Sequence, residues 1–259
     1  MEYYGFMIDM DGTVYKGGNL IKGAVEFIDY LKEVGIPFVF LTNNSSRNRS
    51  FYYSKLKKMG FDVLEKNVLT SNIATIRYVK DNYSGKKVFP IASEDVTEEI
   101  SDSGITLSEK DPDIVYLTFD KTITYNKLNE AYHHILAGAK LVATHPDDVC
   151  PTENSYDVDI GPFIRLFESL GGVKAEVVGK PNLLMLEMAA KEMNVSKDHV
   201  VMVGDRLYTD IKMAFDARTP SILVLSGETS KNDLENSDIK PTYVVDSVKD
   251  IPKLLESLK

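Results

Sequence analysis

The chain of 259 residues contains little that could cross-link it or anchor it. Its one cysteine, Cys150, cannot form a disulfide within the chain, and a zinc site built from cysteines alone is excluded. No apolar run approaches the roughly 20 residues that a membrane-spanning helix needs. The first residues do not place an apolar stretch after a basic one, so we expect no secretory signal. These absences predict a protein of the reducing cytoplasm with no membrane partner.

Positive charge is also scarce, because 39 acidic residues face 30 lysines and arginines and give a formal net charge of −9. No basic stripe is visible, so we expect no nucleic-acid partner. An acidic chain can still bind an anionic substrate where a cation and a lysine reverse the local field. The length itself favours more than one hydrophobic core.

Short apolar segments alternate with segments of helical periodicity in the first and last thirds of the chain. Continuously apolar strands separated by helices are typical of parallel strands that are buried on both faces. We therefore predict an α/β fold with an open, doubly wound parallel sheet. The predicted strands are 4–8, 38–41, 200–203, 221–225 and 243–245, and the predicted helices are 24–34, 50–59, 72–81, 182–193, 208–216 and 251–258.

The middle of the chain reads as a smaller α/β unit of its own. The chain would leave the first unit once, build the second and return. We predict a core of residues 1–81 and 178–259, with residues 82–177 as an inserted α/β domain. Within this insert the predicted strands are 87–91, 114–117 and 140–143, and the predicted helices are 94–101, 125–136 and 161–169.

Four apolar runs are each followed directly by a polar cluster. Because the carboxyl ends of parallel strands lie on one edge of a sheet, where ligands bind, we expect these clusters to meet at one site. The clusters are Asp9-Met10-Asp11-Gly12-Thr13, Thr42-Asn43-Asn44-Ser45-Ser46, Gly179-Lys180-Pro181 after Val177-Val178, and Gly204-Asp205-Arg206 with Asp210 five residues beyond Asp205.

The meeting point would place four carboxylates beside one lysine, namely those of Asp9, Asp11, Asp205 and Asp210. Carboxylates this close repel one another unless some share a cation, and their hard oxygens suit Mg²⁺. A remaining carboxylate can act as a nucleophile, and another as general acid and base. Lys180 and Thr42 would hold phosphoryl oxygens. Gly12 would let the backbone turn sharply beside the metal.

Each cluster has a simpler interpretation when it is taken alone. The first is typical of a turn, the second of a helix N-cap, the third of a surface turn and the fourth of a strand-to-helix cap. A calcium loop starting at Asp9 fails, because its twelfth position holds Leu20 rather than glutamate. All four clusters in this order, each at the end of an apolar run, favour a catalytic site.

Together the motifs resemble the haloacid dehalogenase-like superfamily of phosphohydrolases, and the resemblance covers essentially the whole chain. It implies that Asp9 is the nucleophile that becomes phosphorylated. It also implies that Asp11 protonates the leaving group and then activates water. Thr42 and Asn43 would bind the phosphoryl group, and Lys180 would steady the nucleophile and the phosphate.

The same resemblance implies a Mg²⁺ site. Its expected ligands are Asp9, Asp205 and the backbone carbonyl of Asp11, and Asp210 would support the waters of the metal or Lys180. We expect the substrate-binding residues to be Gly12, Thr42, Asn43, Asn44, Asp147 and Lys180.

The position of the long insert, between Thr42 and Lys180, narrows the resemblance. With Ala143-Thr144-His145-Pro146-Asp147, it is similar to the NagD-like (p-nitrophenyl phosphatase) branch, whose α/β caps cover the site and select the substrate. His145 stands where this branch more often has Asn or Asp. Cys150 stands where its pyridoxal-phosphate phosphatases tend to have His, which argues against vitamin B6 phosphate as the substrate.

The expected function is a Mg²⁺-dependent phosphatase that hydrolyses small phosphorylated metabolites, including p-nitrophenyl phosphate, through an aspartyl-phosphate. Two alternatives stay open: a phosphotransferase on the same core, and a non-catalytic protein that binds a phosphorylated ligand. The sequence names neither the physiological substrate nor the oligomeric state, and a homo-oligomer is compatible with it.

Overall fold

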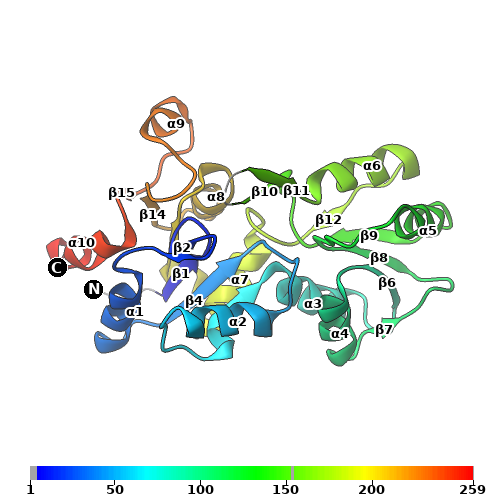
Figure 1. Ribbon diagram of the computed structural model, residues 1–259, viewed down its shortest axis with the longest axis horizontal. Coiled ribbons are helices and arrows are strands. Elements are labelled where there is room, and N and C mark those ends of the chain that lie inside the picture. Colours follow the sequence, from blue (N-terminus) through cyan, green and yellow to red (C-terminus); the bar gives the residue numbers. More distant parts are fainter. Residues whose placement is uncertain (1–4, 153–154, 259) are drawn as a thin grey trace. The chain divides into compact units, whose positions relative to one another are not determined.

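The computed structural model describes residues 5–152 and 155–258, and its contacts divide the chain into two compact units. The core unit comprises Met1–Thr42, Tyr52–Leu69 and Lys180–Lys259. The insert unit comprises Asn43–Phe51 and Thr70–Gly179. Figure 1 shows both units along the chain.

Among the described residues the core unit contains a six-stranded sheet in the order β15-β14-β13-β1-β4-β5. Its central pairs are parallel, with Ile8 opposite Val203 on one side and opposite Phe40 on the other. The predicted doubly wound parallel sheet is confirmed. Its strands are β1 (Gly5–Asp9), β4 (Phe38–Thr42), β5 (Val68–Thr70), β13 (Val200–Gly204), β14 (Ser221–Val224) and β15 (Tyr243–Val245).

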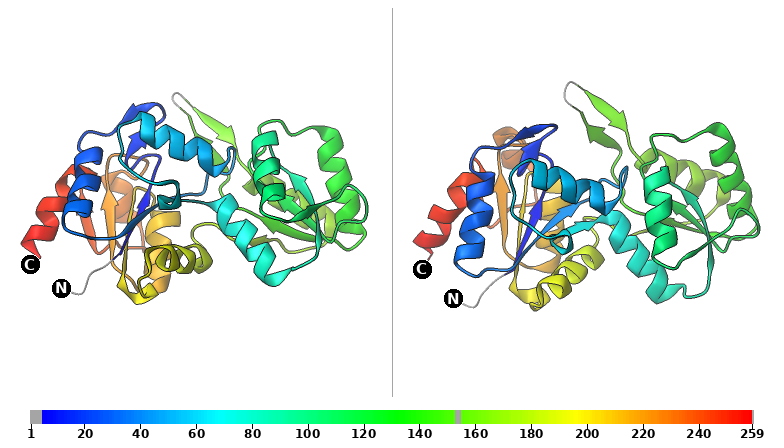
Figure 2. Two further views of the ribbon diagram at one scale, coloured as in Figure 1. Left: turned by 90° about the horizontal axis from the view of Figure 1, so that it is seen from below. Right: turned by 60° about the horizontal axis from the view of Figure 1, so that its bottom comes forward.

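Helices cover both faces of this sheet (Figure 2). Successive side chains of a strand point to opposite faces, and Phe6 and Ile8 join one apolar cluster with residues of α1 and α10. On the other face α7 packs against β1 and β4. The helices of the core unit are α1 (Ala24–Glu33), α7 (Leu183–Met193), α8 (Lys212–Ala217), α9 (Lys231–Asn236) and α10 (Ile251–Ser257), with α2 (Arg49–Lys58) at a border between the units.

The insert unit is built around a second parallel sheet, which in the described residues has five strands in the order β12-β9-β8-β6-β7. A separate antiparallel hairpin, β10 and β11, follows β9 along the chain. The strands are β6 (Lys87–Ile91), β7 (Thr106–Leu107), β8 (Ile114–Leu117), β9 (Lys140–Ala143), β10 (Val149–Pro151), β11 (Tyr156–Val158) and β12 (Glu176–Val177). The helices are α3 (Ser71–Asn82), α4 (Glu94–Asp102), α5 (Tyr125–Leu136) and α6 (Gly161–Gly171).

One sequence-based expectation about the sheets is wrong. The run Val177-Val178 was expected to end beside the core strands, but β12 pairs in parallel with β9 in the insert sheet, with Val177 opposite Ala143. Val177 packs against the apolar cluster of that sheet, so its burial is satisfied in the insert unit. Lys180 therefore enters the core unit directly from a strand of the other sheet.

The contact-based division also differs from the predicted borders at 81/82 and 177/178. The loop Asn43–Phe51 and helix α3 are grouped with the insert unit. Contacts within that unit include the bond from Tyr116 to Asn72, at 2.8 Å. No helix among residues 5–152 and 155–258 is long and apolar enough to span a membrane.

Candidate active site

Asp9 and Lys180 form the centre of the site in the core unit. Asp9 is the last residue of β1, which lies between β13 and β4, so its carboxylate is at the carboxyl edge of the sheet. The ammonium group of Lys180 binds Oδ1 of Asp9, and it lies 2.7 Å from Oδ1 of Asp210. All three side chains are buried. As expected from the sequence, these residues lie together, although Lys180 follows a strand of the insert sheet and not a strand of the core sheet.

Asp205 follows β13 and is held by backbone and hydroxyl donors. The backbone N–H of Glu228 donates to its Oδ2 at 2.7 Å, and the Thr13 hydroxyl lies 3.4 Å from its Oδ1. Asp210 is positioned differently, because its Oδ2 accepts the backbone N–H of Arg206 at 3.2 Å.

The predicted helix 208–216 is divided in the structure. It begins as a π-helical turn, Leu207–Ile211, and only then continues as α8. The wider turn is closed by a bond from the Ile211 N–H to the Arg206 carbonyl at 3.1 Å. π-helical turns are rare and occur frequently at functional sites, and this one includes Asp210.

Glycines leave the space that these carboxylates occupy. Gly12 has φ +91°, which favours glycine, and a Cβ there would lie 2.3 Å from Oδ2 of Asp205. A Cβ on Gly227 would lie 1.9 Å from the same atom, and a Cβ on Gly204 would lie 2.4 Å from Asp210. The backbone therefore approaches Asp205 from two loops. Gly12, expected to bind substrate, has a steric role toward Asp205 in this structure.

The buried charged groups of the site shift one another's pKa values. Burial, with the nearby carboxylates of Asp9 and Asp210, raises the pKa of Asp205 well above its usual range. Burial also raises the pKa of Asp210 to about 6, against the opposing effect of Lys180. Burial alone would lower the pKa of Lys180, but the carboxylates of Asp210 and Asp9 outweigh it and raise that pKa. The lysine is therefore held as a cation between two carboxylates.

Asp11 is set apart from this cluster. Its side chain is half-buried, in the turn that pairs Asp11 with Tyr15. Burial raises the pKa of its carboxyl, and the charge of Lys55 and a hydrogen bond from the backbone of Gly17 oppose that rise. A raised pKa is suited to a group that must give up and take back a proton.

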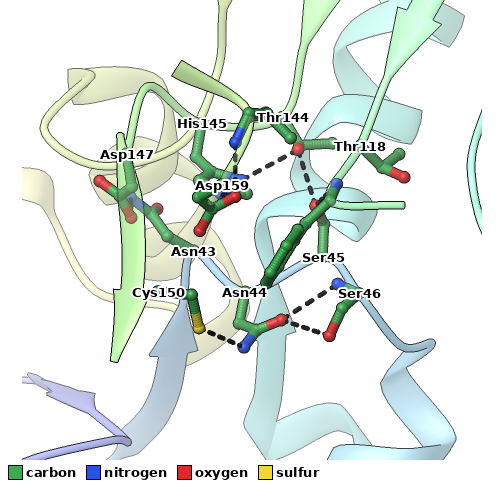
Figure 3. A network of polar contacts seen from close by, with 12 residues as sticks. Asn43, Asn44, Ser45, Ser46, Thr118, Thr144, His145, Asp147, Cys150 and Asp159 are labelled. Atoms are coloured by element: carbon green, nitrogen blue, oxygen red, sulfur yellow. Dashed lines mark hydrogen bonds and ion pairs between the residues drawn. The ribbon is translucent and has the colours of Figure 1, made fainter. Parts of the chain in front are cut away.

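The expected phosphoryl-binding loop follows β4. Thr42 ends that strand, directly after Leu41, which is the register partner of Asp9. Figure 3 shows the residues after Thr42, from Asn43 to Ser46, among the polar side chains of the insert unit. Asn43 donates from Nδ2 to Oδ2 of Asp147 at 3.1 Å. Oδ1 of Asn44 accepts from the N–H and the hydroxyl of Ser46, at 3.0 and 2.7 Å.

These contacts bear on two residues that we expected to bind substrate. Asp147 is buried and accepts from Asn43. Asn44 also donates to Sγ of Cys150 at 3.6 Å. In this structure both side chains shape the loop itself.

The core unit contains a donor set that fits a divalent cation. Carboxylate oxygens of Asp9, Asp205 and Asp210 lie within 4.8 Å of one another. Three buried carboxylates face one ammonium group, and burial, with the nearby carboxylates of Asp9 and Asp210, raises the pKa of Asp205. Hard oxygen donors suit a divalent metal. Both oxygens of Asp210 already accept from Lys180 and the Arg206 N–H, whereas the Thr13 contact to Asp205 is long, so Asp9 and Asp205 fit a cation better.

Some of the residues that shape the site were missed in the sequence. The segment after β14 wraps Asp205 through Gly227 and Glu228, and the Ser226 hydroxyl donates to the Gly12 carbonyl at 2.8 Å. A signal was present, because polar residues follow the predicted strand 221–225, as they follow the others. Asp159, which binds His145 in the insert unit, had no such signal.

Comparison with known proteins decides the family. A model of the haloacid dehalogenase-like hydrolases matches residues 6–106, and one of HAD-like hydrolases matches residues 177–251. The acid sugar phosphatase of Staphylococcus haemolyticus is 32% identical over 100% of this chain and 97% of its own. The chain belongs to the haloacid dehalogenase-like hydrolases. The resemblance found in the sequence is confirmed.

Two further relatives extend this result. The 5'-nucleotidase YutF of Bacillus subtilis is 31% identical over 95% of this chain and 96% of its own. The crystal structure of a 4-nitrophenylphosphatase from Thermotoga maritima has a TM-score of 0.93 and 37% identity, and covers 97% of each chain. These relatives also support the assignment of this chain to the NagD-like (p-nitrophenyl phosphatase) branch. All are named as phosphoric monoester hydrolases, and this chain is an enzyme of that class, as predicted.

Proposed function

We propose that this hydrolase is a Mg²⁺-dependent phosphatase of small phosphorylated metabolites that works through a phosphorylated Asp9. The observation that carries the proposal is the buried contact of Lys180 with both Asp9 and Asp210. A cation at this place holds the Asp9 carboxylate in position, which favours its use as a nucleophile.

The reaction has two steps. In the first, an oxygen of Asp9 attacks phosphorus, the ester P–O bond breaks, and Asp11 gives its proton to the departing oxygen. In the second, Asp11 takes a proton from water as the water oxygen attacks phosphorus, and the bond from phosphorus to Asp9 breaks. The raised pKa of Asp11 supports this role, because such a carboxyl is protonated more readily before the first step.

Asp9 and Asp205 would hold the Mg²⁺, together with the backbone carbonyl of Asp11. The ion, when bound, offsets the negative charge on the phosphoryl group as it is transferred. Asp210 would act through Lys180. The donor set of the core unit supports this division, since the oxygens of Asp210 already have donors of their own.

Thr42, Asn43 and Lys180 would bind the phosphoryl oxygens. Gly12 would shape the loop that carries Asp11, and Asn44 would shape the loop that carries Asn43. Asp147 would act on Asn43, which it contacts, or on the leaving group. We propose that the insert unit is the substrate-selecting cap, with residues 82–177 as its body.

The relatives suggest which esters to test. One is named as an acid sugar phosphatase and another, of nearly equal identity, as a 5'-nucleotidase. Overall identity therefore does not choose between these substrates. We propose sugar phosphates and nucleoside monophosphates as the substrate classes, with p-nitrophenyl phosphate as a convenient artificial one.

The test is phosphate release from these three classes of ester, with Mg²⁺ and with excess chelator. We expect Mg²⁺-dependent release and an acid-quenched peptide that carries phosphate on Asp9. Phosphate transferred to a sugar acceptor in place of release would identify a phosphotransferase. Binding without either reaction would contradict the catalytic proposal altogether.

A further inference from the structure

A chain of buried polar contacts runs through the insert unit from Asp159 to Ser45 (Figure 3). Nε2 of His145 lies 2.9 Å from Oδ1 of Asp159, and its Nδ1 lies 3.0 Å from the hydroxyl of Thr144. That hydroxyl lies 2.9 Å from the hydroxyl of Ser45. The backbone N–H of Phe119 donates to Ser45 at 2.9 Å. All of these side chains are buried, and the proposed mechanism uses none of them.

One set of donor and acceptor assignments, with a neutral His145 ring, satisfies all of these contacts. Oδ1 of Asp159 already accepts the N–H of Ile160 at 2.7 Å, so it is an acceptor and Nε2 of His145 carries the proton. In the neutral ring, Nδ1 is then an acceptor, and it takes the proton of Thr144. Thr144 has no second proton, so Ser45 donates to it. The Asp159 contact thus fixes a ring tautomer whose effect reaches Ser45.

The same residues could be taken for a metal site, since ligand atoms of His145, Asp147 and Asp159 lie within 4.8 Å of one another. The hydrogen bonds argue otherwise. Both ring nitrogens of His145 already have partners, and Asp147 accepts from Asn43. A cation would have to displace the proton that joins His145 to Asp159.

Thr144 holds two segments that lead directly to catalytic residues. Its hydroxyl contacts Ser45, in the loop that follows Thr42. Its carbonyl accepts the N–H of Gly179 at 2.8 Å, and Gly179 directly precedes Lys180. A Cβ on Gly179 would lie 2.5 Å from that carbonyl, so the approach is close.

We propose that His145, oriented by Asp159, is a positioning residue that fixes the phosphoryl-binding loop through Thr144 and Ser45. The inference rests on the proposed function, because it assigns phosphate binding to Thr42 and Asn43. The loop would bind the phosphoryl group similarly in the substrate and in the transition state. Its displacement should therefore raise KM and the dissociation constant of phosphate more than it lowers kcat.

Two substitutions of His145 distinguish a positioning role of this side chain from a role in packing alone. The amide of asparagine reaches the place of Nδ1, so His145→Asn retains an acceptor for Thr144. The amide of glutamine reaches the place of Nε2, so His145→Gln retains the Asp159 contact and loses the Thr144 contact. We expect His145→Gln to raise KM and the phosphate dissociation constant about tenfold. We expect His145→Asn to stay within about twofold of the wild type.

Further variants check the path. Ser45→Ala should raise KM and the phosphate dissociation constant as much as His145→Gln does. The double variant should be no worse than either single variant, because both substitutions break the same series of hydrogen bonds. Asp120→Asn is the matched control. Asp120 is buried in the same unit and binds Lys127 at 2.6 Å, but this pair is not part of the chain. The Asp120→Asn substitution should lower the unfolding temperature without changing the affinity for phosphate.

The readouts are steady-state kinetics and calorimetric binding of inorganic phosphate in the presence of Mg²⁺. Equal phosphate affinity of His145→Gln and His145→Asn would overturn the proposal, as would an equal loss in Asp120→Asn. Metal binding that persists in Asp205→Asn and disappears in His145→Gln would overturn it in favour of a metal site. If the wild type binds phosphate but turns over no ester, the proposed function fails, and the two His145 variants still test positioning. A wild type that binds no phosphate contradicts both.

Discussion

The ammonium nitrogen of Lys180 lies 2.7 Å from Oδ1 of Asp210, and both side chains are buried in the core unit. Asp210 is itself held by the backbone N–H of Arg206, within a π-turn. The pair explains how a lysine that arrives from the insert sheet is directed to Asp9. In the proposed mechanism, Asp210 would supply a second carboxylate that keeps Lys180 charged and in place when the Asp9 carboxylate becomes an acyl phosphate.

Asp9→Asn should abolish turnover while the fold is kept. The amide is nearly the same size as the carboxylate, but it is a far poorer nucleophile and a weaker metal ligand. We expect a fall in kcat on the order of 10³-fold or more. The measurement is phosphate release, with circular dichroism to show folding. Asp216→Asn, at an exposed pair with Lys212, is the control and should be near wild type.

Asp11→Asn should act according to the leaving group. An alkyl phosphate needs its departing oxygen protonated, whereas nitrophenolate leaves well without a proton. The phosphorylation step should therefore slow much more with a sugar phosphate than with p-nitrophenyl phosphate. Single-turnover measurements with both esters test this. Equal losses with the two esters would remove Asp11 from the role of acid.

Chelator should remove the activity and Mg²⁺ should restore it. Ca²⁺ should bind at the same carboxylates and inhibit, because its larger and more flexible coordination does not hold the groups in line. Activity measured against Mg²⁺ at several fixed Ca²⁺ concentrations should show competition. Full activity in excess chelator would contradict the assignment of Asp9 and Asp205 to a metal.

The sequence predicted the elements and the core of the site because the signals were local. Strands such as Lys87–Ile91 and helices such as Tyr125–Leu136 have the predicted bounds, since each is an apolar or periodic run between turn residues. Asp9 and Asp205 were expected to lie together because Asp9 ends one buried strand and Asp205 directly follows another, and parallel pairing determines where strands end.

What the sequence did not predict depends on partners that are distant along the chain. Whether β12 joins the core sheet or the insert sheet depends on which edge is free, and a two-residue strand contains no such information. His145 and Asp159 are 14 residues apart, and their contact joins a loop to the residue before the N-cap of α6, with no periodic pattern to mark it. The π-turn at Leu207–Ile211 has the same apolar spacing as an ordinary helix start.

Glu99 should make the stability of the insert unit depend on pH. Burial raises the pKa of its carboxyl above the usual 4.5, although the Arg49 N–H and the Asn72 amide oppose the rise. The folded state therefore holds this proton to a higher pH than the unfolded state does. As the pH rises from 4.5 through the folded pKa, the contribution of Glu99 to the free energy of unfolding falls, and above that pKa it is constant.

Glu99→Gln removes this titration. The free energy of unfolding of the wild type, minus that of the variant, should be larger near the low end of the pH range than at neutral pH. Urea unfolding in chelator at a series of pH values measures the difference. Asp102→Asn on the same helix is a suitable comparison. A difference that is constant with pH, or that grows as the pH rises, would contradict the raised pKa.

Gly227→Ala should weaken the metal site through sterics alone. An added Cβ would lie 1.9 Å from Oδ2 of Asp205, and the same oxygen accepts the N–H of Glu228 at 2.7 Å, so either the loop or the carboxylate must move. Forcing a carbon into a packed place typically costs about 1–3 kcal/mol. We expect a lower unfolding temperature and a higher Mg²⁺ concentration for half-maximal activity. Gly18→Ala is the matched control, because a Cβ there would meet nothing within 4 Å. If the two variants need the same Mg²⁺ concentration, the close approach of this loop does not position Asp205.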